Sequence, residues 1–320
     1  MTHETPVPAA PSGITAAQVY GAFVAGGMMT WLLLHRAGLA IDPWARSNLP
    51  YYAAGLLALL LRLGPIRHWR HGRALGDGAE YYALFTAIAL TGAVASYPIA
   101  ALTHGYADAG LERIDVALRF DWLAWYRTVA AHRPLQLLGI AAYESIYLTP
   151  AVLLGWYAVH GERDRAYGFL ATFWLAAAIT LSLFGLMPAV GPLSHLWHGP
   201  LPYMPVSELW QPDLIPALRA HAVGIVDLGQ LRGIVSAPSF HAAAGTLYIA
   251  TAWRTRVLRW PLLWLNVGML IATPVEGTHY LADMVIGAVV ALVAIGAVRS
   301  FEGRLASRPA DRKPFAAVWS

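Results

Sequence analysis

The sequence contains no cysteine. A chain without thiols has no disulfide framework, no thiolate nucleophile and no cysteine-bound zinc, so these three kinds of site are excluded. The same absence leaves the redox compartment of the protein undetermined.

Charged residues are also scarce. Only 12% of the 320 residues are charged, whereas 58% are hydrophobic, a composition typical of a polytopic membrane protein rather than of two soluble domains. The isoelectric point near 9.4 would suggest nucleic-acid binding in a soluble protein. Here the arginines lie in short loops between apolar runs, where membrane topology explains them, so no nucleic-acid partner is predicted.

Apolar runs recur along the whole chain. A helix needs about 20 apolar residues to cross a bilayer. We interpret eight runs as transmembrane helices, of which the second and the seventh are short, at residues 15–35, 48–64, 80–103, 134–159, 165–187, 239–256, 260–275 and 278–299. No internal repeat is visible. The sequence therefore predicts an all-α, polytopic transmembrane bundle of about eight spans.

The spans divide the chain into four parts. Residues 1–14 are polar, rich in Pro and Ala, and lack the basic start of a secretory signal, so we predict a short disordered N terminus. Residues 15–79 form two accessory helices, residues 80–299 a six-helix catalytic core, and residues 300–320 a cytoplasmic tail.

Two segments of the core lie outside the spans. In residues 108–131, apolar side chains recur at steps of three and four opposite charged ones, which predicts an amphipathic interfacial helix. Its simplest role is a brace in the membrane plane, and a gate for lipids is the alternative. Residues 188–238 are rich in proline and predict a long extracytoplasmic loop, which we interpret as a lid over the site.

The basic residues indicate an orientation. If both termini are cytoplasmic, most of the 22 lysines and arginines fall in inside loops and in the C-terminal tail. This is the bias expected of membrane proteins. We therefore predict a protein integral to the cytoplasmic membrane, with its active site on the periplasmic or equivalent extracytoplasmic side.

Two polar islands interrupt the last apolar runs, SAPSFH at residues 236–241 and EGTHYLAD at residues 276–283. Each opens a helix with a histidine in its first turn. The i to i+4 spacing puts His279 and Asp283 on one helix face, so the carboxylate can hold one imidazole N–H and leave the other nitrogen free. This pattern indicates an activated nucleophile. Helix N-termini also present unpaired N–H groups, which favour an anion such as phosphate.

The ordered motifs PSFH, a helical spacer and GTHYLADMVIG resemble the second and third signature motifs of the type 2 phosphatidic acid phosphatase superfamily. LMPAVGP, at residues 186–192, resembles a motif of its inositol-phosphorylceramide-synthase-like branch. The resemblance covers roughly residues 80–299. It implies that His279 attacks phosphorus and forms a phosphohistidine, that Asp283 orients His279, and that His241 protonates the leaving oxygen. It also implies membrane lipids as substrates and neither a metal nor an organic cofactor.

The chain departs from the family pattern at two places. The family's first motif has the form K-x6-R-P, and the nearest match, Arg127 to Pro134, is one residue too short. Thr273 stands where the phosphatases have an arginine before the third-motif histidine. The ceramide-phosphotransferase-like branch lacks this arginine too, which favours a transferase. Substitute cations for a phosphate group are Arg232, Arg133 and Arg127.

Three further residues are candidates for substrate binding. Ser239 is a helix N-cap whose hydroxyl or N–H group would also touch phosphate if the family resemblance holds. Glu144 and Glu276 are acids within or beside apolar runs. Each is suited to a polyol or amine headgroup or to accepting a proton, and a paired structural carboxylate is an equally good interpretation.

Four functions remain open. The favoured one is a lipid phosphotransferase that moves a phosphate or phospho-headgroup from a lipid donor to a hydroxyl acceptor. The alternative on the same fold is a phosphatase that acts on a lipid phosphate or polyprenyl diphosphate with water as acceptor. An intramembrane metalloenzyme would use His241, His279, Asp283 and Glu276 as ligands. A transporter would use the intramembrane acids and histidines as a proton relay.

Overall fold

The computed structural model describes residues 13–64 and 68–307, and the regular elements in these ranges are helical, which confirms the predicted all-α fold. A single parallel bridge joins Ala40 and Ile225. The short 3-10 helices are η1 (Arg46–Asn48), η3 (Ser145–Tyr147) and η4 (Leu228–Gln230). The α-helices are α1 (Ala16–Arg36), α2 (Leu49–Leu63), α3 (Gly72–Ala101), α4 (Asp108–Ala117), α5 (Trp122–Ala131), α6 (Arg133–Glu144), α7 (Leu148–His160), α8 (Arg163–Leu186), α9 (Pro192–Leu196), α10 (Gln211–Arg219), α11 (Phe240–Ala252), α12 (Arg259–Glu276) and α13 (Leu281–Ala306).

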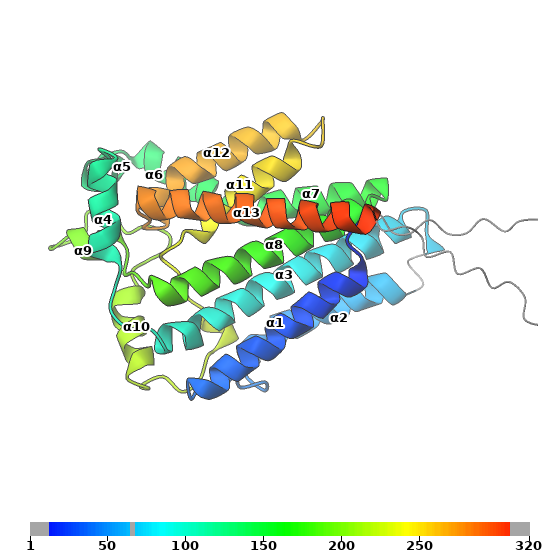
Figure 1. Ribbon diagram of the computed structural model, residues 1–320, viewed down its shortest axis with the longest axis horizontal. Coiled ribbons are helices and arrows are strands. Elements are labelled where there is room, and N and C mark those ends of the chain that lie inside the picture. The colour runs from blue at the N-terminus through cyan, green and yellow to red at the C-terminus, as the bar shows by residue number, and fades with distance from the viewer. Residues whose placement is uncertain (1–12, 65–67, 308–320) are drawn as a thin grey trace, which may run out of the picture.

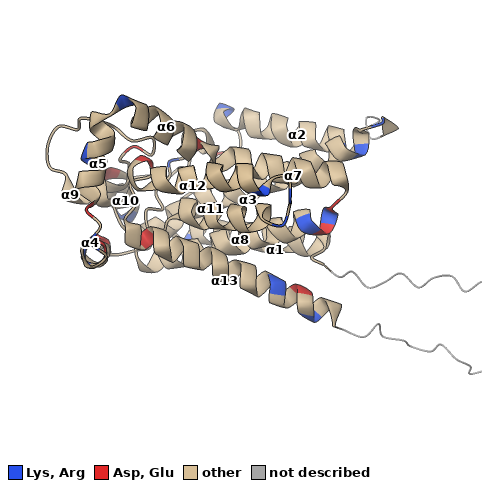
Figure 2. Cartoon of the chain, turned by 90° about the horizontal axis from the view of Figure 1, so that it is seen from above, with Lys and Arg blue, Asp and Glu red and all other residues tan. Residues whose placement is uncertain are grey.

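The long helices run beside one another along the longest axis of the molecule (Figure 1). Helices α4, α5, α9 and α10 gather at one end, where α11 and α13 begin. Helix α1 begins and α13 ends at the opposite end. Most charged residues lie toward the two ends, and the middle of the bundle is largely uncharged (Figure 2). This distribution is that of a bundle that crosses a bilayer.

Five segments are long and apolar enough to cross a membrane. They are α1, α3, the combined unit of α6 and α7, α8 and α13. Five of the eight predicted spans therefore correspond to segments that qualify as candidate spans by length and composition. Helices α2 and α11 have only 15 and 13 residues, fewer than the roughly 20 that a span needs. Helix α12 is continuous over 18 residues, carries the buried polar residue Asn266, and begins at Arg259 and ends at Glu276.

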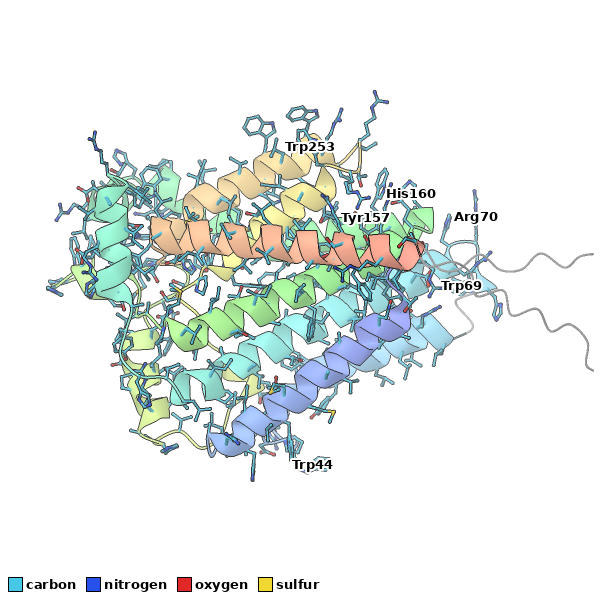
Figure 3. The ribbon with its side chains drawn as sticks, viewed as in Figure 1. Trp44, Trp69, Arg70, Tyr157, His160 and Trp253 are labelled. Atoms are coloured by element: carbon cyan, nitrogen blue, oxygen red, sulfur yellow. The ribbon has the colours of Figure 1, made fainter. Side chains whose placement is uncertain are left out.

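Aromatic and polar side chains mark the two ends of the bundle (Figure 3). Trp44, 90% exposed, follows α1 on the side where α1 ends. Trp69, Arg70 and His160 lie at the other end, where α13 ends. Tryptophans and basic side chains are enriched at membrane–water interfaces, so the two groups indicate where the interfaces lie.

The centre of the bundle is an aromatic-rich core shared by α3, α7, α8, α11 and α13. The rings of Phe85 and Phe173 lie 4.5 Å apart, and Tyr81 and Tyr248 are fully buried. Between apolar helices in lipid, such close packing replaces the hydrophobic effect as the main attraction. It fixes α11 and α13, which carry the two histidine motifs, against the same neighbours.

Helices α11 and α13 approach each other closely at Gly287. A Cβ atom built on Gly287 would lie 2.2 Å from the carbonyl oxygen of Ser239 and 3.2 Å from the Cβ of Ala242. The Ser239 N–H also donates to the Asp283 carbonyl oxygen at 3.2 Å. This crossing brings the first turns of the two helices together.

The accessory helices α1 and α2 are tied to α3 through the carboxylate of Glu80. This group accepts hydrogen bonds from Tyr20 of α1 at 3.1 Å and from Tyr167 of α8 at 2.6 Å, and it pairs with Arg62 of α2. Because an ionised group inside a membrane protein is costly unless paired, the four helices form one polar junction.

The single interfacial helix predicted for residues 108–131 is wrong. The structure divides this segment into α4 and α5. Arg119 between them has φ 57°, a left-handed conformation that ends a helix, and the Asp121 side chain accepts the N–H of Ala124 at 2.9 Å to start α5. The predicted apolar face is accordingly broken, because Leu111 and Trp122 are buried whereas Leu118 is 53% exposed.

Residues 188–238, predicted as a loop, contain α9, α10 and η4 and cover the end of the bundle where α11 and α13 begin. The Arg232 N–H donates to the Tyr97 hydroxyl at 2.8 Å, and Arg219 donates to Thr103 and to the Gly105 carbonyl oxygen. Contacts with α3 and with the residues that follow it thus hold this segment in place.

Gly287→Ala should destabilise the protein by about 1–3 kcal/mol, because the added methyl group overpacks the crossing of α11 and α13. Thermal unfolding in detergent measures the effect. Gly296→Ala in the same helix is the matched control, since a Cβ there meets nothing within 4 Å. An equal response of the two variants would contradict the importance of the crossing.

Candidate active site

The His279 ring and the Asp283 carboxylate form a buried pair. His279 Nδ1 lies 3.0 Å from Asp283 Oδ1, and their side chains are 4% and 0% exposed. The other carboxylate oxygen accepts the Tyr280 N–H at 2.8 Å. This leaves His279 Nε2 without a hydrogen-bond partner in the described part of the chain. The contact expected from the i to i+4 spacing is thus present, and it fixes the ring with one nitrogen free.

A tight turn between α12 and α13 places His279. Thr278 adopts φ 50°, and the His279 N–H donates to the Pro274 carbonyl oxygen at 3.1 Å. From α5, the indole N–H of Trp122 bridges the carbonyl oxygens of Pro274 and His279 at 3.0 and 3.1 Å. The interfacial segment therefore braces the turn that carries the histidine.

His241 approaches the same point from the first turn of α11. Its ring stacks on Tyr143 with centroids 4.0 Å apart, and it lies 6.4 Å from the His279 ring. Ser239 is the N-cap, because its hydroxyl oxygen accepts the Ala242 N–H at 3.2 Å. The structure thus brings the predicted residues His241, His279, Asp283 and Ser239 together.

The two helix N-termini differ in what they offer an anion. At α13, Asp115 accepts the N–H groups of Leu281 and Ala282 at 2.9 and 2.7 Å. Burial raises the pKa of the Asp115 carboxyl group, and these two bonds oppose that rise. The anion site predicted at this terminus is therefore filled by the protein's own carboxylate.

The start of α11 remains open. Within residues 13–64 and 68–307, the N–H groups of Phe240 and His241 have no hydrogen-bond partner. First-turn N–H groups are the ones that a helix leaves unpaired. The free donors of the site therefore lie on the His241 side.

Gly191 is the point where the three sequence motifs converge. It has φ +91°, and a Cβ atom there would lie 2.9 Å from the Thr278 carbonyl oxygen and 3.2 Å from the hydroxyls of Ser236 and Thr278. Both hydroxyls are buried and lack a partner among the residues that the structure describes. Asp108 holds this glycine, accepting the Val190 and Gly191 N–H groups at 3.0 Å each.

Glu276 is engaged with the segment that covers the site. Its carboxylate is buried and accepts the Tyr203 hydroxyl at 2.8–2.9 Å and the Val206 N–H at 3.3 Å. Burial and this carboxylate raise the pKa of the Tyr203 phenol. In the described ranges, no three His, Asp or Glu side chains are grouped to hold a metal ion.

Glu144 lies apart from the two histidines. It is the last residue of α6, next to Tyr143, and its side chain is exposed on the outside of the bundle. No hydrogen bond or ion pair engages it in the part of the chain that the structure describes. Among the described residues, no hydrogen bond joins Glu144 to Glu276.

The three candidate cations have other partners. Arg232 lies over the Trp210 ring at 4.0 Å, Arg133 donates to Gln136 at 3.1 Å, and Arg127 lies 5.8 Å from the Trp197 ring centroid. Across the described ranges, none of them hydrogen-bonds to the two histidines or to Asp283.

Thr273, at the position where the resemblance implied an arginine, is fully buried, and its hydroxyl donates to the Met269 carbonyl oxygen at 2.7 Å. Its side chain thus bonds within its own helix.

Several supporting residues were not predicted from the sequence. Asp108 and Asp115 are buried on α4, on the same face as the buried Leu111. Their spacing of seven residues, two helical turns, puts both on one face and was an available signal. No sequence pattern indicated that Tyr143 stacks on His241 or that Trp122 braces the turn, because both contacts join distant segments.

The fold and this geometry define a helical membrane protein in which two histidines and an aspartate meet at the starts of two adjacent helices. The family model of the PAP2 superfamily matches residues 109–297, so the chain belongs to that superfamily. Membership implies phosphatase or phosphotransferase activity on phosphate esters. The match includes all three motifs and begins after α3. No curated protein and no solved structure matches the chain.

Gly191→Ala should strongly reduce activity on phosphate esters and lower the unfolding temperature, because the methyl group displaces Thr278 next to His279. Gly105→Ala is the control, since Gly105 also has positive φ but a Cβ there meets nothing within 4 Å. Gly191 has φ 91° and ψ 155°, a region open essentially to glycine alone, so the difference between the two variants reports this backbone strain together with the crowding. Equal activity of Gly191→Ala and Gly105→Ala would contradict the importance of the tight fit at Gly191.

Tyr203→Phe should destabilise the packing of the segment 188–238 over the site by about 1.5–3 kcal/mol, since it removes the hydrogen bonds from the hydroxyl to the buried carboxylate of Glu276. Thermal unfolding and the rate of proteolysis within residues 199–209 are the measurements. Tyr106→Phe serves as control, because Tyr106 is 43% exposed. If both variants are cleaved at the wild-type rate, Glu276 does not hold the cover.

Proposed function

We propose that the protein is an integral membrane lipid phosphotransferase of the inositol-phosphorylceramide-synthase-like branch. It moves a phosphate or phospho-headgroup from a lipid donor to a hydroxyl acceptor through a phosphohistidine. One observation carries the proposal. The buried pair of His279 and Asp283, 3.0 Å apart, has a free imidazole nitrogen and lies beside the His241 ring, 6.4 Å away.

In the first step, the lone pair on His279 Nε2 attacks phosphorus, while Asp283 holds the Nδ1–H group and stabilises the positive charge that develops on the ring. The N–P bond forms and the P–O bond to the donor breaks. Protonated His241 gives its proton to the leaving oxygen.

In the second step, neutral His241 takes the proton of the acceptor hydroxyl. The acceptor oxygen attacks phosphorus, the N–P bond breaks, and both histidines return to their starting states. The acceptor therefore replaces the donor on the same phosphoryl group, and no other reactant is needed.

The phosphate is bound on the His241 side. The N–H groups of Phe240 and His241 are free there, and the hydroxyl of Ser239 retains its proton for donation because its oxygen is the acceptor of the cap bond. The unpartnered hydroxyls of Ser236 and Thr278 are further donors in the described structure. We propose that these groups donate hydrogen bonds to the phosphate in place of the arginine that the family's phosphatases have at this position.

In the proposed site, an arginine guanidinium group also binds the phosphate and balances its negative charge. We retain Arg232 as the first candidate, because it precedes the PSFH motif and its backbone is anchored to Tyr97. Arg133 and Arg127 are the second choice and would reach the phosphate by leaving Gln136 and Trp197.

The two acids have different proposed roles. Glu144, exposed beside the Tyr143 ring that stacks on His241, would meet an amine or polyol headgroup as the lipid approaches. Glu276 would hold residues 188–238 closed as a lid, through its bonds to Tyr203 and Val206.

Exclusion of water favours transfer over hydrolysis. His279 is 3% exposed and lies under the segment 188–238, so bulk water has little access to a phosphohistidine in this arrangement. Hydrolysis of a lipid phosphate or polyprenyl diphosphate is the second candidate, because the superfamily includes phosphatases.

The arrangement of the chain supports eight crossings. Helix α1 begins and α13 ends at the same end of the bundle (Figure 1), which requires an even number of passes, whereas five segments qualify by length and hydropathy. Adding α2, α11 and α12, which return the chain between these segments, gives eight. Residues 80–299 would then form the six-helix core, with α1 and α2 as accessory helices.

The same arrangement supports the orientation. The basic loops between α2 and α3, α7 and α8, and α11 and α12 lie toward the end where α13 ends, opposite the two histidines. By the positive-inside rule, that end is cytoplasmic and the site faces the periplasmic or equivalent extracytoplasmic side.

The decisive experiment is turnover of the purified protein on phospholipids and lipid phosphates, with and without ceramide, diacylglycerol and inositol-type acceptors. Wild-type protein should move a headgroup only when an acceptor is present. His279→Ala should lose roughly three orders of magnitude or more of activity. His160→Ala, at the other end of the bundle, is the control. Phosphate release without an acceptor would make the protein a phosphatase, and full activity of His279→Ala would refute the site.

A second readout separates the two histidines. Label from a phosphate-labelled donor should remain on wild-type protein and be absent from His279→Ala. His241→Ala should recover much of its rate with an aryl phosphate donor, because an aryl oxygen leaves without a proton. Equal loss with both kinds of donor would contradict the role of His241 as the acid.

A further inference from the structure

A cavity of about 200 Å³ lies at the end of the bundle opposite the two histidines. It is a half-open pocket between α8, α11 and α13, and its lining includes Glu302 and the exposed residues Arg165, Arg254, Arg299 and Asp164. The charges come from α8, from α13 and from the turn after α11, which carries Arg254, so the fold itself assembles them. Nothing in the proposed reaction uses them.

The charges that line this cavity do not neutralise one another. In the described part of the chain, neither Arg254 nor Arg299 has a carboxylate within 4.0 Å, and neither Asp164 nor Glu302 has a basic partner. Arg165 pairs at 3.0 Å with Glu162, which is outside the lining. Unpaired groups of both signs therefore face one space.

The two carboxylates are positioned by glycines. A Cβ on Gly168 of α8 would lie 3.1 Å from Glu302 Oε1, and a Cβ on Gly13 would lie 3.1 Å from the Cβ of Asp164. Glu302 thus rests against α8, and Asp164 against the residues before α1. These contacts keep the acids on the walls of the cavity.

We propose that this cavity binds a zwitterionic phosphoethanolamine-type group, with its phosphate on the arginines and its ammonium on Asp164 and Glu302. Guanidinium groups match phosphate oxygens with paired N–H donors. A phosphate alone would face two carboxylates, and a cation alone would face three arginines. A group that carries both charges satisfies every unpaired side chain.

The site is separate from the catalytic histidines. Sixteen residues of α13 separate Asp283 from Arg299, which corresponds to about 24 Å along the helix. The cavity lies at the end where α13 ends (Figure 1), near the interface marked by Trp69 and Arg70. A phospholipid headgroup in that leaflet, or free phosphoethanolamine from solution, would reach it without passing the active site.

The test is equilibrium binding to the purified full-length protein. Labelled phosphoethanolamine and short-chain phosphatidylethanolamine should bind, and inorganic phosphate and short-chain phosphatidylglycerol should bind at least about tenfold more weakly. Arg254→Gln with Arg299→Gln should reduce binding at least tenfold. Binding should persist in His279→Ala, which keeps this result independent of the proposed reaction.

Two variants control for charge and folding. Arg256→Gln with Arg304→Gln removes the same charge from residues outside the cavity lining and should leave affinity within twofold. Arg254→Lys with Arg299→Lys keeps the charge and should give intermediate affinity.

Stronger binding of short-chain phosphatidylethanolamine than of free phosphoethanolamine identifies a site for a lipid headgroup. Stronger binding of free phosphoethanolamine identifies a site for a soluble ligand. Both outcomes support the proposal. Equal loss in the control pair, equal affinity for phosphatidylglycerol, or no binding would overturn it.

Discussion

The first turn of α13 is held by carboxylates, and the arrangement of the site depends on this. Asp283 accepts the Tyr280 N–H and holds the His279 ring, while Asp115 accepts the next two N–H groups. Because these carboxylates already neutralise the positive partial charge at the N-terminus of α13, a further anion is bound only weakly there. In the proposed reaction, the phosphate would therefore bind at α11, and His279 would face it as the nucleophile.

Charged groups in the membrane-facing part of a protein are stable only when they are paired or functional. Glu80 and Glu276 follow this rule: the first joins four helices, and the second joins α12 to the segment over the site. Glu144 does not, which is why it retains a proposed role in meeting the substrate. The same reasoning separates structural from functional acids without reference to any relative.

The sequence was sufficient where the information is local. The spacing of His279 and Asp283 and the capping residue Ser239 depend on neighbours within four positions, and both were predicted correctly. The α4–α5 break was missed because it depends on a single left-handed residue, Arg119. The role of Gly191 was out of reach, because it results from contacts with Ser236 and Thr278, which are distant in the chain. Which of Arg232, Arg133 and Arg127 binds the phosphate stays a prediction.

The backbone bond from Ser239 to Asp283, together with the tight approach at Gly287, makes the starts of α11 and α13 a single rigid body. His241 and His279, the proposed catalytic residues, would therefore keep their relative geometry while other parts of the protein move. Under the proposed function, a lipid would reach the histidines by displacing the surrounding parts, which are the segment 188–238 and the junction of α5 and α6. Substitutions in these outer parts could then change the selectivity for different lipids without altering the geometry of the two histidines.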